Sequence, residues 1–423
     1  MVKTLYICYL GLFEPLVQTQ VLPYLCLLAD AGIDVTLLTF ESTKWTLHDQ
    51  EHWRDELAKR QIRWVSRRYH KRPSLPATMY DIAAGALLVS RLVRREGIHV
   101  LHARSHVPAT MAILAKRNSG CRMLFDIRGF FPEEYVDAGV WPAGGFLYKL
   151  TKKVENVLLA GADHCIVLTN RAREVLRSGA YPDLPINVPI EVIPCCVDFE
   201  RFKRANGCRT SVRRELNVAG RQVLVYVGAM GGWYLSEQMA DFLAAAHARK
   251  STVFSLILTQ SSVTQTIESL TRRGIPDDSF MVRTVAPTEV PRYLCAADLA
   301  FCFIKPAYSK LSSSPTKIGE YLAAGLPVVC NSGIGDIDEL LFTDRVGVLV
   351  RDFTQNSYTQ ALDDAERLVK EEDIAERCRQ SACKHFDLRT VGGARYLEVY
   401  RRLGASLQEQ VAGEHSAGST RRI

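Results

Sequence analysis

The feature that most constrains the fold is the alternation of short apolar runs with longer amphipathic segments along the chain. The apolar runs are rich in Val, Ile and Leu and are bounded by turn residues, as is typical of strands buried in parallel sheets. Segments 19–32 and 78–97 between them have a helical pattern. The predicted strands are 4–10, 33–40, 99–103, 121–127, 164–169, 222–228, 253–259, 279–285, 299–304, 326–330 and 346–350. This order predicts an α/β protein with helices on both faces of parallel sheets.

The chain of 423 residues is too long for one ordinary core. A proline-rich segment, 181–202, separates two similar α/β halves. We predict an N-terminal domain at 1–195, a C-terminal domain at 196–385 and a helix at 386–404 that returns to the first domain. We expect the tail, 405–423, to be disordered. Two such domains would bind ligands at the carboxyl ends of their strands, in a cleft.

Composition narrows the class of protein. The chain is 47% hydrophobic and 23% charged, as soluble proteins are. No apolar run reaches the roughly 18–20 uncharged residues of a membrane helix, and no signal peptide opens the chain, so we expect a cytoplasmic protein. The 12 cysteines form neither a metal-type pattern nor a compact disulfide framework, and Cys8, Cys165 and Cys330 lie in apolar runs. The net charge of +7 suits anionic substrates or a membrane surface, or simply solubility, and no nucleic-acid-binding motif is present.

Segment 312–341, SSSPTKIGEYLAAGLPVVCNSGIGDIDELL, carries the strongest functional signal. Ser314 as N-cap and Pro315 as first residue predict a helix start. Lys317 then lies in the first turn, where the helix dipole disfavours a cation unless an anion also binds. Glu320 lies on the same face and could accept hydrogen bonds from both hydroxyls of a ribose. These residues predict a nucleoside diphosphate site; the alternative is an exposed Lys–Glu pair on a capped helix.

The same segment resembles the donor signature of the retaining glycosyltransferases of family four, which have the GT-B fold of two Rossmann-like domains. The matching residues are Pro315, Lys317, Glu320, Ala323, Gly325, Pro327, the turn 333–335 and Glu339. The resemblance implies that Glu320 holds the ribose of the donor. It also implies that the side chain of Lys317 and the backbone of residues 313–317 hold the diphosphate. These residues are Ser313, Ser314, Pro315, Thr316 and Lys317.

Two positions depart from the family pattern. A second glutamate is common eight residues before Glu320, where this chain has Ser312. An arginine and a lysine are common after the first strand of the donor domain, where this chain has Ala229 and no lysine before Trp233. Gly228, Gly231 and Gly232 in that loop still allow a phosphate to approach the backbone. Arg283 or Lys305 could supply the missing charge, although surface salt bridges are the ordinary role for both. The GxxGG spacing does not fit the GxGxxG pattern of a dehydrogenase.

The first half resembles family-four enzymes of bacterial polysaccharide pathways. The pieces that carry this resemblance are PLVQTQVLPYLCLLADAGIDVTLLTFE, YHKRPSLPATMYDI, HVLHARSHVP, FDIRGFFPEEYVDAG and ADHCIVLTNRAREVL. The resemblance implies that the loop from Glu14 to Gln20, including Gln18, lies near the acceptor. Polar residues also follow two predicted strands: His102, Arg104 and His106 follow or end one, and Asp126 and Arg128 the next. We predict that Asp126 binds acceptor and that the other four take part in catalysis.

The sequence therefore predicts a GT-B glycosyltransferase that moves a hexose-type sugar from a nucleotide sugar, most simply a UDP-sugar, to a saccharide or lipid-linked acceptor. The resemblance implies retention at the anomeric carbon, no cofactor or metal, and possible contact with the inner face of the cytoplasmic membrane. Two alternatives stay open. One is a nucleotide-sugar epimerase or hydrolase of the same fold, and the other is an inactive nucleotide-sugar-binding protein, suggested by Ser312 and Ala229.

Overall fold

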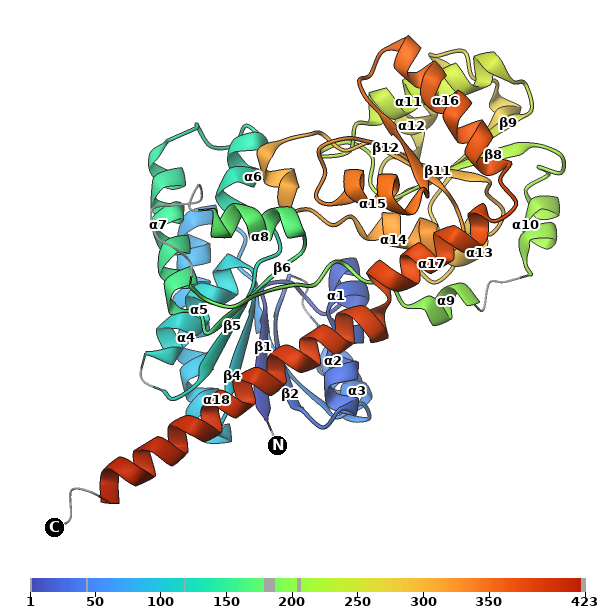
Figure 1. Cartoon of the computed structure of the whole chain (residues 1–423). Helices are drawn as coiled ribbons and strands as arrows, with labels where there is room; N and C mark the ends of the chain where they lie inside the picture. The colour runs from blue at the N-terminus through green and yellow to red at the C-terminus, as the bar shows by residue number, and fades with distance from the viewer. Residues whose placement is uncertain (1, 43–44, 118, 179–186, 204–206, 420–423) are drawn as a thin grey trace. The chain divides into compact units, whose positions relative to one another are not determined.

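The computed structural model describes residues 2–42, 45–117, 119–178, 187–203 and 207–419. It divides into two units: unit 1 comprises Met1–Pro194 and Arg389–Ile423, and unit 2 comprises Cys195–Leu388 (Figure 1). The division lies close to the predicted boundary at residue 195, and the chain returns to unit 1 after Leu388. Within the described residues, no helix is long and apolar enough to cross a membrane.

Unit 1 contains a parallel sheet of seven strands in the order β3-β2-β1-β4-β5-β6-β7. The strands are β1 (Lys3–Cys8), β2 (Asp34–Glu41), β3 (Ile62–Arg68), β4 (Val100–Arg104), β5 (Arg122–Asp126), β6 (His164–Val167) and β7 (Ile190–Val192). The sequence did not predict β3 or β7, the two strands at the edges. In β3, exposed and buried residues alternate at its start and arginines recur, as suits a strand with one free edge.

Helices cover both faces of this sheet. Those of unit 1 are α1 (Pro15–Gln20), α2 (Leu22–Asp30), α3 (Leu47–Ala58), α4 (Ser74–Glu96), α5 (His106–Lys116), α6 (Phe131–Asp137), α7 (Phe146–Gly161), α8 (Asn170–Arg177) and α18 (Ala394–Ser419). α5 packs between α4 and α7, so these three form one layer on the sheet (Figure 1). α4 and α5 each follow a strand directly, and α7 follows the short helix α6 after β5 and leads back to the start of β6. The N-termini of all three therefore lie at the carboxyl edge of the sheet.

Helix α18 returns the end of the chain to unit 1 after the π-helical turn η3 (Leu388–Gly393). The Tyr400 hydroxyl lies 2.9 Å from both Thr4 Oγ1 and His102 Nδ1, and Arg395 donates to the Val192 carbonyl. The helix continues to Ser419, whereas the sequence predicted an end at 404 and disorder from 405. The residues after 404 include Ala, Leu, Gln and Glu, which favour helix once a preceding turn exists.

Unit 2 contains a parallel sheet of six strands in the order β10-β9-β8-β11-β12-β13. The strands are β8 (Gln222–Val227), β9 (Val253–Leu258), β10 (Phe280–Arg283), β11 (Leu299–Cys302), β12 (Val328–Asn331) and β13 (Gly347–Val350). Helices and short turns surround it: α9 (Phe199–Lys203), α10 (Arg209–Glu215), α11 (Ser236–Arg249), α12 (Val263–Thr271), η1 (Asp277–Ser279), α13 (Val290–Leu294), η2 (Tyr308–Ser312), α14 (Thr316–Ala323), α15 (Ile337–Asp344), α16 (Gln355–Val369) and α17 (Ile374–Phe386). The strand order reverses between β8 and β11, which is where open α/β sheets bind ligands.

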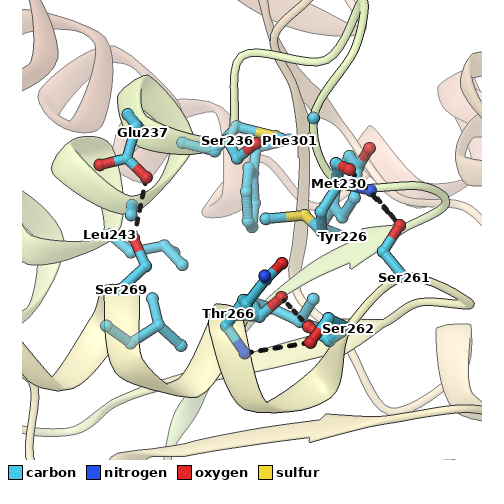
Figure 2. Close-up of a pocket in the computed structure, with 16 residues that line it drawn as sticks. Tyr226, Met230, Ser236, Glu237, Leu243, Ser261, Ser262, Thr266, Ser269 and Phe301 are labelled. Carbon is cyan, nitrogen blue, oxygen red and sulfur yellow. Dashed lines mark hydrogen bonds between the residues drawn. The ribbon is translucent and has the colours of Figure 1, made fainter.

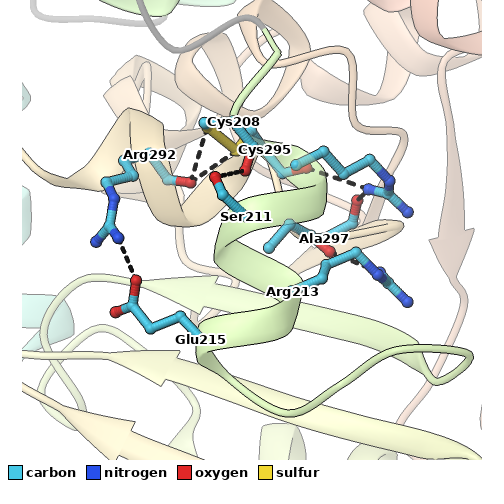
Figure 3. Close-up of a disulfide and its surroundings, with 9 residues drawn as sticks. Cys208, Ser211, Arg213, Glu215, Arg292, Cys295 and Ala297 are labelled. Carbon is cyan, nitrogen blue, oxygen red and sulfur yellow. Dashed lines mark hydrogen bonds and ion pairs between the residues drawn. A yellow bond between two sulfur atoms is a disulfide. The ribbon is translucent and has the colours of Figure 1, made fainter.

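A disulfide joins Cys208, at the start of α10, to Cys295, at the end of α13 (Figure 3). Their Cα atoms lie 6.5 Å apart although the residues are 87 positions apart in sequence. The sequence analysis did not predict this bond, because only the fold brings these two loops together. Cys8, Cys165 and Cys330 are free and buried, as their apolar neighbours predicted.

Candidate functional site

The loops that follow β8 and β11 are held together at the carboxyl edge of the unit 2 sheet. The Leu235 N–H donates to the Phe303 carbonyl at 3.0 Å, and the Lys305 N–H donates to the Trp233 carbonyl at 2.8 Å. The first loop carries Gly228, Gly231 and Gly232, and the second leads into α14. The structure therefore brings the predicted glycine loop and the predicted diphosphate-binding residues to one place in the fold.

Helix α14 begins one residue later than predicted. Its N-cap is Pro315, which cannot cap with a side chain, and Thr316 is its first residue. Ser314, the predicted N-cap, instead accepts a hydrogen bond from the Cys195 N–H through its hydroxyl, at 3.2 Å. Within the described residues, no acceptor meets the backbone N–H groups of Thr316 and Lys317. The start of α14 thus presents uncapped donors and a positive dipole end.

Lys317 is the second residue of α14 and is only 7% exposed. Its ammonium donates to the Tyr226 hydroxyl at 3.0 Å and lies 3.5 Å from the centre of the Tyr234 ring. No carboxylate of the described residues forms an ion pair with it. Burial lowers the pKa of Lys317 to about 8, because the charged form loses its hydration. A buried cation without an anionic partner beside uncapped N–H groups is the geometry expected of an anion site.

Gly228 makes room for Lys317. A Cβ at this position would lie 2.5 Å from Lys317 Nζ, and its φ of +137° is one that side chains rarely permit. The following turn uses Gly231 and Gly232 with φ of +85° and +63°. Behind the turn, a cavity of about 180 Å³ lies between α11 and α12, and Ser261 in its wall accepts the Met230 N–H (Figure 2). The loop is therefore fixed from behind and leaves its backbone close to Lys317.

Glu320 lies one turn further along α14, with a mostly buried side chain. Burial raises its pKa, while Arg201 and Lys317 act in the opposite direction. Arg201, on α9, approaches its carboxylate at 3.8 Å. The sequence analysis missed Arg201, since nothing local connects α9 with α14.

Lys310 is a second cation that the sequence analysis missed in the loop before α14. It is buried, and its ammonium lies 3.8 Å from the centre of the Trp233 ring. Of the two cations considered from the sequence, Lys305 lies 6.0 Å from the centre of the same ring, whereas Arg283 stacks on Tyr293. Ser312 donates its hydroxyl hydrogen to the Ser309 carbonyl inside η2.

In unit 1, three of the predicted site residues surround a fourth, Asp126, which is fully buried. Its carboxylate lies 3.4 Å from Arg128, 3.6 Å from Arg104 and 3.7 Å from His102, and it accepts a hydrogen bond from Tyr396 of α18. Burial alone would raise the pKa of Asp126, but Arg128, His102 and Arg104 together hold it far below its usual range. Asp126 and His102 contact Tyr396 and Tyr400 of α18, and Arg104 contacts Asp126. The roles of these residues in acceptor binding and catalysis stay predictions. Of the four predicted residues, only Arg128 keeps a partly exposed side chain.

His106 also has a structural position. Its Nε2 lies 2.7 Å from Glu155 of α7, its ring stacks on Phe131, and both members of the pair are buried. His106 thus joins α5 to α7, and its part in catalysis stays a prediction. In the predicted acceptor loop, Glu14 is exposed at the start of α1, Gln18 donates to the Leu12 carbonyl, and Gln20 is buried.

A polar group at the carboxyl edge of unit 1 was missed by the sequence analysis. The buried carboxylate of Asp81, on α4, accepts hydrogen bonds from the Tyr9 hydroxyl at 2.7 Å and the His70 N–H at 3.0 Å. His70 Nδ1 lies 2.6 Å from the same carboxylate. Tyr9 follows β1 and His70 follows β3, so Asp81 ties two loops of this edge to α4.

Comparison with known families agrees with this architecture. Residues 17–201 match the model of Glycosyltransferase Family 4, and residues 221–366 match the model of Glycosyl transferases group 1. No match was found among curated proteins. The two family matches fall on the two halves of the chain, one in each sheet-bearing region.

Several solved structures share the fold. A glycosyltransferase from Rickettsia africae has a TM-score of 0.72 at 16% identity, covering 95% of this chain and 98% of its own. Sucrose-phosphate synthase from Thermosynechococcus elongatus has a TM-score of 0.70 at 16% identity, covering 96% and 100%. HepE from Anabaena in complex with UDP-glucose has a TM-score of 0.65 at 15% identity, covering 95% and 100%. With its two Rossmann-like sheets and both family matches, the chain belongs to the family-four type of glycosyltransferase and has the GT-B fold.

Proposed function

We propose that the chain transfers a hexose-type sugar from a UDP-sugar to a saccharide or lipid-linked acceptor, with retention at the anomeric carbon, in polysaccharide or glycoconjugate biosynthesis. The observation that carries the proposal is Lys317: a buried ammonium without a carboxylate partner, beside uncapped N–H groups and one turn from Glu320. The choice of UDP is supported by HepE, whose structures hold UDP or UDP-glucose, and by an E. coli structure with UDP-2-fluoro glucose.

The proposed chemistry is departure of the nucleoside diphosphate from the anomeric carbon. Negative charge then accumulates on the leaving phosphate, where Lys317 and the first N–H groups of α14 would stabilise it more than in the bound substrate. Glu320 would hold the ribose hydroxyls and so fix the donor. Because an ammonium and helix N–H groups supply this stabilisation, we propose transfer without a metal ion or cofactor. The leaving phosphate is the group that we propose takes the acceptor proton.

The acceptor part of the proposal rests on unit 1. Arg128 keeps a partly exposed side chain and is our first candidate there for contact with a developing negative charge. The exposed Glu14 of the loop after β1 and the partly exposed Gln18 are the acceptor-binding candidates. A lipid-linked acceptor at the inner face of the cytoplasmic membrane would also suit the net charge of +7.

A thermal-shift panel with UDP-, GDP- and dTDP-sugars tests the donor assignment, because a ligand that binds only folded protein raises the unfolding midpoint. We expect UDP and UDP-sugars to stabilise the chain, and Lys317→Met to remove most of that shift. Lys250→Met, a change of an exposed lysine in the same unit, is the matched control and should keep the shift. Equal shifts in both variants would refute the proposed role of Lys317.

Turnover distinguishes transfer from the two alternatives. An epimerase or hydrolase would convert the UDP-sugar without any acceptor, whereas a binding protein would bind it and never turn it over. The transferase proposal predicts that release of UDP requires, or is strongly accelerated by, an acceptor saccharide. Rapid conversion in acceptor-free buffer would overturn it.

A further inference from the structure

The segment from Arg67 to Tyr80 in unit 1 combines unpaired positive charge with exposed apolar side chains. It spans the end of β3, a loop and the first turns of α4. Its sequence, RRYHKRPSLPATMY, contains four cations: Arg67, Arg68, Lys71 and Arg72. In the part of the chain that the structure describes, none of these four forms an ion pair with a carboxylate, and all but Arg67 are classed as exposed.

Large apolar side chains follow the cations at once. On α4, Leu75 is 54% exposed, Met79 63% and Tyr80 57%. Exposed apolar groups beside a positive cluster are unusual on a freely hydrated surface, because each side chain gives up free energy that burial would recover. A surface that pairs cations with apolar side chains fits a partner that is negative at its face and apolar beneath it.

The segment is anchored from beneath. Asp81 accepts both the backbone N–H and the side chain of His70, in the middle of the cationic run, and also the Tyr9 hydroxyl. Asp81 is therefore buried and holds the loop. Glu41, which lies on β2 opposite Arg68, is also buried and accepts hydrogen bonds from the Leu12 N–H and the Thr39 hydroxyl. The neighbouring cations lie on a backbone that these hydrogen bonds hold in place. Because they form no ion pair with a carboxylate of the described residues, they can bind an external anion.

The helix layer of α4, α5 and α7, which includes the last part of the segment, also carries few exposed acidic side chains. Of the acidic residues on α4, α5 and α7, Asp81 and Glu155 are buried and Glu96 pairs with Arg63. At the N-terminus of α7, which lies at the same carboxyl edge of the sheet, Phe146 is 78% exposed and Lys149 is exposed.

We infer that the segment Arg67–Tyr80 is a docking surface for an anionic lipid bilayer, with the cations at the headgroups and Leu75 and Met79 inserted among the chains. The inference deepens the proposed function, on which it rests for the idea of a lipid-linked acceptor. The surface lies at the carboxyl edge of the unit 1 sheet, the edge from which the loop with Glu14 and Gln18 emerges. Docking there would bring that loop to the membrane.

The test is flotation of the full chain with vesicles of phosphatidylcholine alone or mixed equally with phosphatidylglycerol. We expect binding to the mixed vesicles and little to the neutral ones, weakened by salt because exposed charges are screened beyond about 10 Å at 0.1 M. Lys71→Gln with Arg72→Gln should weaken binding on the order of tenfold or more, since each cation near an anionic surface contributes about 1 kcal/mol. Leu75→Ser with Met79→Ser should weaken it by a similar factor.

Two matched controls keep the test specific. Arg94→Gln with Arg95→Gln removes two exposed cations from the other end of α4, and Phe342→Ser removes an 84% exposed apolar side chain from unit 2. Both should bind as the unchanged chain does. Equal loss in controls and test variants, no binding to mixed vesicles, or a self-association that the Leu75 and Met79 changes abolish in place of vesicle binding would each overturn the inference. UDP stabilisation is measured in parallel without vesicles, so failure of the donor assignment is seen separately.

Discussion

Asp126 in unit 1 and Lys317 in unit 2 are both nearly inaccessible to solvent, yet their surroundings differ. Asp126 is surrounded by two arginines, a histidine and a tyrosine that compensate its charge. Lys317 has a tyrosine hydroxyl, two aromatic rings and no carboxylate partner among the described residues. A buried charge is costly unless it is paired. The paired carboxylate of Asp126 thus stabilises the fold, whereas the unpaired ammonium of Lys317 indicates a site for an external anion.

The largest expected effect follows from removing the compensated charge. Asp126→Ala leaves Arg104 buried without its partner, which should lower the free energy of unfolding by about 3–5 kcal/mol. Urea denaturation of the full chain measures this change. Asp55→Ala, at an exposed position on α3, is the control and should change little. A loss no larger than that of the control would mean that the cluster is not a structural unit.

Lys317→Met should have the opposite effect on stability and a strong effect on binding. The pKa of Lys317 is about 8 in the folded chain and 10.5 in the unperturbed side chain. Between these pH values the unfolded chain therefore binds more protons than the folded chain. The free-energy cost of burying the charged ammonium applies in full below about pH 8 and disappears above about pH 10.5. At pH 7 the variant should gain on the order of 1–3 kcal/mol of stability before ligand is added.

The same variant should bind UDP on the order of 100-fold more weakly, because charge-assisted hydrogen bonds to the diphosphate are lost. Its affinity for uridine should not change. Isothermal titration with the two ligands gives both numbers. Equal losses for UDP and uridine would place Lys317 at the nucleoside and not at the phosphates.

Glu320→Gln is expected to act more mildly, since a neutral amide can still accept one hydrogen bond. The preference for UDP over its 2′-deoxy analogue should fall about tenfold. Competition binding with the two nucleotides measures the preference directly. An unchanged preference would remove the ribose from the role of Glu320.

Much of the donor site could be predicted because its parts are local in sequence. Lys317 and Glu320 lie on one short helix, and helix geometry alone puts them on one face. The exact helix start could not be predicted, because the Ser314 hydroxyl is taken by Cys195, 119 residues away. Arg201 and Lys310 were missed for a related reason: their relation to Glu320 and Trp233 exists only in the fold.

The surroundings of the polar residues in unit 1 were harder to predict, because a position at a strand end does not say whether a polar side chain faces solvent. Asp126 ends β5 and His106 begins the helix after β4, but the partner of Asp126 on α18 is 270 residues away. A helix that returns after a whole intervening domain leaves no local signal at the residues it covers. The contacts between these residues and α18 could therefore not be predicted, and their catalytic roles stay predictions.

The most direct test of the account is the affinity for UDP measured by titration calorimetry from about pH 7 to about pH 9.5. Affinity should fall on the order of tenfold as pH rises through about 8, because the ammonium that binds the diphosphate loses its proton. Lys317→Met should bind weakly at every pH, without this fall. An affinity for UDP that does not change with pH in the unchanged chain, or that falls equally in the variant, would contradict the claim that Lys317 binds the diphosphate.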